Sequence, residues 1–496
     1  MYDHFLADLA ATGPILLVAF AGVAVVLIDS FRNDSPAIPW ISAAAMVGAA
    51  AWTSAWLGTA GVAFNGQVLV GGVAGFATLV VLVGAVLSLV LSVPYLTRIR
   101  HNYGEVHGLI LIATAGMMTL VSSGSLVTLF VGLETMSICL YVLTGLVRAE
   151  TTANESALKY FLLGSFSTGF FLYGIALMYG ATGTMLFSEM APGLTETGRP
   201  ALFGVGVALL LIGFLFKVSA VPFHQWTPDV YQGAPTSLTA FMSTASKTAA
   251  FAALAVVLGR AVPAELIGGG GPVQVALAVV AAVTMVFGNV AALTQSNVKR
   301  MLAYSSVAHA GYILAGLATG TAAGTSAALF YLLAYTVMNV GAFGVMGALE
   351  WDNREGAEQT LASLAGMGYR RPLLGVAMGV FMFALTGFPP LGGFIGKYLV
   401  FSAVVQSGMT WLAVIGVLAS VVSAVYYLRV LTTLWMRSAS EGSEGAQAAT
   451  FLPSRATTSV VAICALALLL LGIVPSGVIS LARTAVEGSA AFALLP

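Results

Sequence analysis

Charge is what this sequence has least of. Only 8% of its 496 residues are charged while 59% are hydrophobic, and 19 basic residues balance 19 acidic ones. A typical soluble protein carries about 25% charged residues, so a water-soluble particle of this size is excluded. With a formal net charge of zero, the chain also lacks the basic excess that a nucleic-acid partner requires. These shortages predict an integral membrane protein.

Cysteine is scarce as well. The two cysteines, Cys139 and Cys464, each lie in an apolar run with no Cys or His at ligand spacing. Iron–sulfur clusters are held by several cysteine thiolates, and structural zinc by four Cys or His ligands. The sequence therefore predicts neither a Cys-ligated iron–sulfur cluster nor a structural zinc site on this chain.

Long apolar runs make up most of what remains. A helix that crosses the membrane core needs about 20 mostly apolar residues, and no stretch alternates like a barrel strand. We therefore expect an all-α membrane protein with about fourteen transmembrane helices in one polytopic domain, 1–496. The expected spans are 13–30, 38–58, 68–93, 107–122, 124–147, 157–181, 201–231, 236–258, 273–294, 300–319, 323–350, 370–406, 410–437 and 456–484.

The loop charges predict the orientation. Eleven basic residues, including Lys299 and Arg300 as ordinary charge at a helix mouth, fall in one set of alternate loops, and three fall in the other. Cytoplasmic loops carry the excess of Lys and Arg. We therefore expect both termini on the periplasmic side. The abundance of Ala, Gly and Val favours a bacterial inner membrane.

Four charged residues fall well inside expected spans: Glu134, Lys217, Lys247 and Lys397. A charge at a helix centre costs about 2.5–3.5 kcal/mol even on the lenient scale, so each needs a partner, water or a function. A buried lysine can release its proton, whereas arginine holds it. The four together predict a path for protons, although each one taken singly is also compatible with a local ion pair or a snorkelling side chain.

Two further candidates leave alternatives open. Lys159 stands four residues after Glu155, so a surface ion pair on one helix is as reasonable as a place in the path. His309 lies within a span with hydroxyl residues one turn earlier, and histidine titrates near neutral pH. It can relay a proton or simply be a packed, hydrogen-bonded side chain.

Two spans are long and contain helix breakers. The stretch 201–231 holds Pro222 and Pro228, and the stretch 370–406 holds Pro389 and Pro390 followed by glycines. Broken helices at matching positions of two halves are typical of inverted repeats with an ion path between them. We therefore expect helices 7 and 12 to be broken, within two inverted five-helix repeats made of helices 4–8 and 9–13. These repeats would span 107–258 and 273–437, after three N-terminal helices (13–93) and before a C-terminal helix (456–484).

Two stretches resemble a known family: 155–166 (ESALKYFLLGSF) and 221–235 (VPFHQWTPDVYQGAP). They resemble the antiporter-like membrane subunits of respiratory complex I, the NADH:quinone oxidoreductase. The length of fourteen spans, the stretch 335–343 (YTVMNVGAF) and a lysine rather than a glutamate at 397 favour the N subunits over the larger L subunits, which carry a long lateral helix. The resemblance covers helices 4–13.

The resemblance implies roles for individual residues. Glu134 matches the fifth-helix glutamate that tunes proton release from the seventh-helix lysine, Lys217. Lys247 matches the central connecting lysine, Lys397 the terminal lysine of the broken twelfth helix, and Lys159 a lysine at the start of the sixth. His309 is a candidate from its position only.

The family also implies a function and partners. This chain would translocate protons, driven by redox chemistry on partner subunits that carry NAD, FMN, iron–sulfur clusters and quinone. Its partners would be a neighbouring antiporter-like subunit, small membrane subunits and lipids, with no nucleic acid. The rival interpretations are a subunit of a cation/proton antiporter or membrane-bound hydrogenase complex, and a stand-alone secondary transporter.

Overall fold

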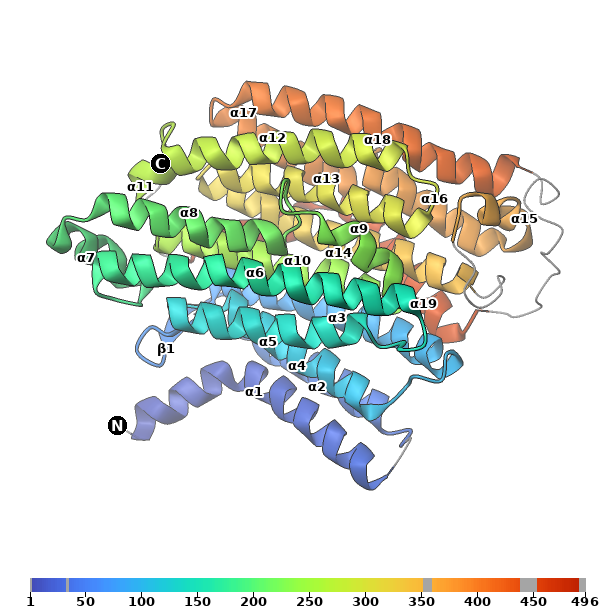
Figure 1. The fold of residues 1–496 in the computed structure, drawn as a ribbon, viewed down its shortest axis with the longest axis horizontal. Helices are drawn as coiled ribbons and strands as arrows, with labels where there is room; N and C mark the ends of the chain where they lie inside the picture. The colour runs from blue at the N-terminus through green and yellow to red at the C-terminus, as the bar shows by residue number, and fades with distance from the viewer. Residues whose placement is uncertain (1, 33–34, 351–358, 438–452, 490–496) are drawn as a thin grey trace.

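The computed structural model describes residues 2–32, 35–350, 359–437 and 453–489, and almost all of them lie in helices that run side by side (Figure 1). Helices dominate because a helix satisfies all its backbone hydrogen bonds internally, as a lipid environment demands. The elements are α1 Tyr2–Phe31, α2 Ile38–Ser54, β1 Ala60–Ala63, β2 Val68–Gly71, α3 Gly72–Arg98, α4 Gly104–Val121, α5 Leu126–Thr144, α6 Thr151–Thr182, η1 Phe187–Glu189, α7 Met190–Thr197, α8 Pro200–Lys217, α9 Trp226–Gly233, α10 Thr236–Arg260, α11 Ala264–Ile267, α12 Pro272–Leu293, α13 Val298–Ala318, α14 Ala322–Leu349, η3 Ala362–Leu364, α15 Met367–Arg370, α16 Pro372–Thr386, α17 Gly392–Gln406, α18 Thr410–Met436, α19 Arg455–Ile473 and α20 Ser476–Glu487.

Within these described residues, twelve helices are long and apolar enough to cross a membrane. The helices α2, α16 and α17 are shorter, with 17, 15 and 15 residues. The all-helical membrane fold is confirmed, while the count of fourteen spans and the two inverted repeats stay predictions.

Both predicted breaks are present. The helix α8 ends at Lys217 and α9 begins at Trp226, and likewise α16 ends at Thr386 and α17 begins at Gly392. Proline has no N–H to donate to the preceding turn, so a helix cannot continue through Pro222 or Pro390 without losing hydrogen bonds. At the first break the Phe216 carbonyl accepts from the backbone N–H of Ser219 at 3.1 Å and from the Trp226 indole N–H at 3.0 Å.

Two expected boundaries are wrong. The third span was expected to begin at residue 68, but residues 68–71 form β2, which pairs antiparallel with β1. The helix starts only after Gly71, where φ is +70° and a Cβ would lie 1.7 Å from the Thr59 carbonyl oxygen. The last span, expected as one helix over 456–484, is two helices, α19 and α20, separated at Pro475.

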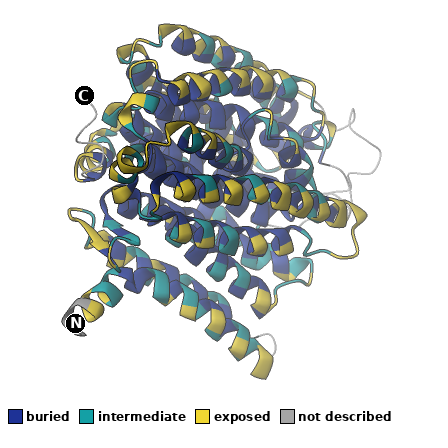
Figure 2. Cartoon of the chain, turned by 60° about the vertical axis from the view of Figure 1, so that its left-hand side comes forward, coloured by how far each residue is buried: buried dark blue, intermediate teal, exposed yellow. Residues whose placement is uncertain are grey.

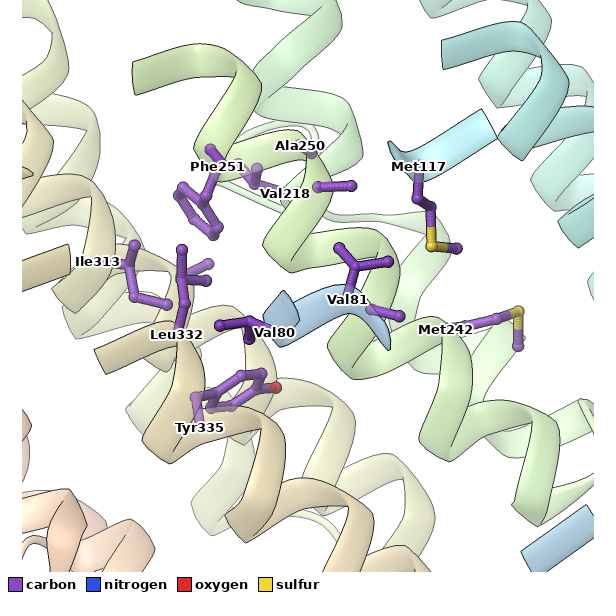
Figure 3. Packing of buried hydrophobic residues seen from close by; sticks show 14 of the residues in the cluster. Val80, Val81, Met117, Val218, Met242, Ala250, Phe251, Ile313, Leu332 and Tyr335 are labelled. Carbon is purple, nitrogen blue, oxygen red and sulfur yellow. The ribbon is translucent and has the colours of Figure 1, made fainter. Parts of the chain in front are cut away.

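The centre of the bundle is formed by α10, α13 and α14. The most apolar stretch of α10 is completely buried, and those of α13 and α14 are 94% buried (Figure 2). The helix α10 packs against α3, α4 and α14, and side chains from these elements meet in one hydrophobic core (Figure 3). A charged residue in the buried middle of α10 or α13 is therefore removed from lipid on every side.

The connecting segments lie at two opposite ends of the bundle. The hairpin strand β1, α7 and α11 lie at one end together with the start of α1, while α15 lies at the other (Figure 1). This separation agrees with the alternation of loops on which the charge count rests.

Candidate functional site

The first buried lysine ends the first half of a broken helix. Lys217 is the last residue of α8, only 5% exposed, and its Nζ donates to the Tyr141 hydroxyl on α5 at 3.2 Å. The ammonium also lies over the rings of Tyr141 and Tyr160, 5.1 and 5.7 Å from their centroids. Aromatic faces attract a cation, so these rings stabilise charge on Lys217 without a carboxylate. A Cβ at Gly164 would lie 2.1 Å from the Tyr141 hydroxyl, so glycine makes room for this tyrosine.

Glu134 lies on the same helix as Tyr141, seven residues earlier. Its Oε1 accepts a hydrogen bond from Thr168 on α6 at 2.8 Å, and the residue is half-buried. Seven residues correspond to about two helical turns, or roughly 10 Å along α5. In the described part of the chain no ion pair joins Glu134 to Lys217. Glu134 and Lys217 are therefore not in direct contact in this conformation, and the Tyr141 hydroxyl lies beside Lys217 instead.

Lys159 lies outside the buried core. Its side chain is 42% exposed and pairs with Glu155 at 2.5 Å and with Asp229 on α9 at 2.8 Å. Asp229 also pairs with Arg300 on α13 at 2.5 Å. The ion pair between Glu155 and Lys159, four residues apart on one helix, is therefore present in the structure. Asp229 extends this pair into a network that connects α6, α9 and α13.

Lys247 is the most deeply buried of the candidate lysines. It is 1% exposed on α10, and its Nζ donates to the backbone oxygen of Ser306 at 2.9 Å and to Ser306 Oγ at 2.5 Å. The Tyr335 hydroxyl donates to the same Oγ at 2.7 Å, and the Tyr231 hydroxyl lies 3.4 Å from it. Ser306 thus joins the lysine to tyrosines from α14 and α9.

The hydroxyl groups that flank Lys247 on its own helix are engaged elsewhere. Ser243 and Thr244 donate to the Ala240 carbonyl, and Ser246 donates to that of Met242. The partner of Lys247 comes from α13 instead.

His309 is hydrogen-bonded on both ring nitrogens. It is 1% exposed, with Nδ1 2.8 Å from the Tyr331 hydroxyl and Nε2 3.1 Å from the Tyr427 hydroxyl. Tyr427 in turn lies 2.5 Å from Ser305 Oγ. Since Ser305 is next to Ser306 on α13, the chain through His309 begins beside the partner of Lys247. On its other side the ring packs edge-on against Tyr312, over whose ring the ammonium of Lys397 lies.

Lys397 donates hydrogen bonds to backbone carbonyls at the second helix break. It is 5% exposed on α17, and its Nζ donates to the carbonyls of Leu385 and Thr386 at 3.0 and 2.8 Å and to Ser420 Oγ at 2.7 Å. These carbonyls end α16, where the helix dipole places partial negative charge. Gly387 has φ +90°, and a Cβ there would lie 2.9 Å from Lys397 Cδ. The interrupted helix therefore supplies both the acceptors and the space for the ammonium.

Residues 123–423 match the sequence profile of the family described as NADH:quinone oxidoreductase/Mrp antiporter, TM. The matched range is more than half of the chain and contains Glu134 and every buried lysine described above. This chain belongs to that family. The helices α1–α4, α19 and α20 lie outside the matched range.

Individual relatives and solved structures indicate which kinds of complex contain similar chains. A Salinibacter ruber protein named NADH-quinone oxidoreductase subunit N is 56% identical over 483 residues, covering 96% of each chain. A Trichlorobacter lovleyi protein of the same name is 43% identical over 480 residues, again covering 96% of each chain. A chain of Thermus thermophilus respiratory complex I is 36% identical, with a TM-score of 0.80, and the match covers 95% of this chain and 99% of that one. A chain of the Dietzia Mrp complex has a TM-score of 0.82 at 21% identity, covering all of both chains, and shares the fold. Within the family, these names favour complex I over the rival interpretations.

The structure brings some predicted residues together and separates others. Lys247 bonds to Ser306, and His309 is linked to the neighbouring Ser305 through Tyr427. Lys397 lies over the ring of Tyr312, which packs against His309. Lys217 has no hydrogen-bonded path to Lys247 within the described residues. Instead, stacked and edge-on rings fill the space between them: Tyr141, Tyr160, Trp226 and Tyr231.

The sequence did not predict the hydroxyl partners of the buried lysines, nor the pairing of Lys299 with Glu350. Lys299, assigned to ordinary loop charge, is buried; its Nζ donates to the Ala234 carbonyl at 2.7 Å and lies 3.9 Å from Glu350 Oε1. Thr236 also donates to Glu350. Burial raises the pKa of Glu350 above that of an ordinary glutamate, and the charge of Lys299 opposes this shift. An acid placed directly after a long apolar span was the available signal.

Proposed function

We propose that this chain translocates protons across a bacterial inner membrane as the N-type antiporter-like subunit of an NADH:quinone oxidoreductase. One observation carries the proposal. Lys217, Lys247 and Lys397 are each at most 5% exposed, and their hydrogen-bond partners in the described structure are hydroxyls and carbonyls rather than carboxylates.

Neutral partners suit a lysine that gains and loses a proton. A carboxylate at contact distance holds an ammonium in its charged form, whereas a hydroxyl can accept from the ammonium and donate to the neutral amine. Each lysine therefore keeps a hydrogen bond in both states. An arginine at these positions would stay charged and could not alternate.

The proposed route follows the central helices. A proton on Lys247 has Ser306 as its first partner, and from the adjacent Ser305 the path continues through Tyr427 and His309 towards Lys397. The charge on Lys217 acts on Lys247 electrostatically across the aromatic rings that lie between them, those of Tyr141, Tyr160, Trp226 and Tyr231. Glu134 acts on Lys217 from two turns away, since charges interact over longer distances where the effective dielectric constant is low.

Lys159 has a different role in this proposal. Its network through Asp229 holds α9, the second half of the broken helix, against α6 and α13. The buried lysines lie next to these three helices, so Lys159 positions the path rather than carrying the proton.

The driving reaction belongs to partner subunits. NADH oxidation with FMN and iron–sulfur clusters, and quinone reduction, would take place there, and the neighbouring antiporter-like and small membrane subunits would transmit the bias to this chain. The orientation with both termini on the periplasmic side is part of the same proposal. Stable co-purification with redox subunits in mild detergent separates this assignment from a stand-alone transporter.

The test is Lys247→Met in the assembled complex, reconstituted in sealed vesicles. Methionine keeps most of the volume and removes the charge, so the packing cost is small. We expect proton uptake and coupled quinone reduction to fall by roughly a hundredfold or more, the loss typical of removing a group that transfers protons. The matched control is Ser246→Ala next to it, whose hydroxyl bonds its own helix. Activity of the Lys247→Met complex equal to that of the control would reject the route at its centre.

A further inference from the structure

A cavity of about 740 Å³ opens at one end of the bundle, and the buried lysines Lys217, Lys247 and Lys397 are not among its lining residues. It lies between the end of α1, the start of α2, the last turns of α3, the first turn of α4 and the start of α19. Apolar side chains of α3, among them Leu89, Val90 and Val93, line one part of it. The volume is in the range of cavities that bind small molecules.

The polar part of the cavity contains a buried histidine with one free nitrogen. His107 is 1% exposed, and its Nε2 lies 3.0 Å from the Asn102 Oδ1. Because that oxygen can only accept, Nε2 carries the hydrogen, and the neutral ring presents a lone pair at Nδ1. Within the described residues, Nδ1 is buried and has no partner. The site therefore lacks a hydrogen-bond donor.

A carboxylate in the same cavity lacks a donor too. Asp29 Oδ2 accepts from the backbone N–H of Gly104 at 2.8 Å, but its buried Oδ1 has no partner in the described structure. Gly104, which donates to Asp29, stands three residues before His107 on α4, so the carboxylate and the ring lie on the same side of this helix. Two unpartnered acceptors, one of them anionic, call for a cationic donor with several N–H groups.

The mouth of the cavity has the opposite charge and an aromatic border. Arg100 lines it and is exposed, and a guanidinium there suits a phosphate. Trp40 and Tyr103 also line it and are 78% and 44% exposed. Such aromatic residues are typical of the level of the lipid headgroups.

We propose that this cavity binds one phospholipid whose headgroup ends in a primary ammonium. The ammonium donates to Asp29 Oδ1 and His107 Nδ1, the phosphate accepts from Arg100, and the acyl chains lie along α3. A trimethylated headgroup cannot donate to the two acceptors. A headgroup with hydroxyls and no amine would leave the charge of Asp29 uncompensated.

The probe is a phosphatidylethanolamine with a photoactivatable group on its acyl chain, added to vesicles that contain the whole membrane complex. Mass spectrometry of the cross-linked peptides reports the site. We expect labelling within 86–98 and 36–46, and competition by unlabelled phosphatidylethanolamine roughly tenfold stronger than by phosphatidylcholine or phosphatidylglycerol, as the loss of one charged hydrogen bond implies.

Two variants and one control sharpen the test. Asp29→Asn keeps an acceptor for Gly104 but removes the charge, and Arg100→Gln changes an exposed side chain that folding does not require. Each is expected to reduce labelling roughly tenfold, while Asp8→Asn, on the same helix but outside the cavity, leaves it unchanged. Equal competition by all three lipids, preference for phosphatidylglycerol, labelling elsewhere, or a cavity filled by a neighbouring subunit would each overturn the proposal.

Discussion

Replacing Ser306 by alanine tests the proposed route at its most connected hydroxyl. Its Oγ receives hydrogen bonds from Lys247 at 2.5 Å and from Tyr335 at 2.7 Å. A hydrogen bond to a charged group contributes about 1.5–3 kcal/mol, and each 1.36 kcal/mol is tenfold in rate or occupancy, which gives roughly 10- to 150-fold. Lys247 keeps its bond to the Ser306 carbonyl, so we expect the lower end, a loss of roughly tenfold in coupled turnover.

The assay is proton uptake and quinone reduction by the assembled complex in sealed vesicles. Ser243→Ala is the matched control, because Ser243 is equally buried and donates only to the Ala240 carbonyl of its own helix. Assembly of both variants is checked by native electrophoresis, and substitutions of this kind rarely cost more than about 1–2 kcal/mol of stability. If Ser306→Ala turned over as fast as Ser243→Ala, protons would not pass by way of this hydroxyl, and the reasoning would be refuted.

Four further outcomes are expected from the same complex. Lys217→Ala should reduce proton pumping while assembly persists, and normal pumping would remove this residue from the path. Glu134→Gln should reduce coupled turnover too, with a double variant little worse than either single one, since residues that act as a unit give non-additive losses; strictly additive losses would show two independent roles. Neither Lys217→Arg nor Lys397→Arg should restore normal pumping, because arginine resists deprotonation; full activity in both would indicate purely structural charges. Burial raises the pKa of Glu350 and favours its neutral acid form in the folded protein. The contribution of this neutral acid to the stability of the fold is therefore complete below the pKa of an ordinary glutamate, and it is lost as pH rises through the raised pKa of Glu350. Glu350→Gln should therefore gain in unfolding temperature relative to the unmodified complex as pH rises, and a pH-independent difference would contradict this.

The sequence predicted the features that depend on local chemistry. Proline and glycine pairs located both helix breaks, because a missing N–H acts on the residues next to it. The lysines were recognisable as buried because each stands within an apolar run. Even so, the two lysines occupy different places: Lys217 ends the first half of its broken helix, whereas Lys397 lies in the second half of its own.

The partners of these lysines could not be predicted. Ser306 meets Lys247 across 59 positions of sequence, and Tyr427 meets His309 across 118. Such contacts depend on how α10, α13, α14 and α18 pack, and hydrophobic periodicity gives no information on this. For the same reason Lys159 and Lys299 were interpreted incompletely, since one lies near the surface and the other in the interior although both stand near helix ends.

Three hydroxyl groups of α10 that donate to carbonyls of their own helix bear on the side from which a proton reaches Lys247. Ser243, Thr244 and Ser246 donate their hydrogens to carbonyls of their own helix, and none of these three hydroxyls is bonded to Lys247. The hydroxyl bonded to Lys247 is that of Ser306 on α13. In the proposed route, the lysine therefore exchanges its proton through the face of α10 that meets α13. One-sided access of this kind prevents a short circuit that would dissipate the gradient the complex builds.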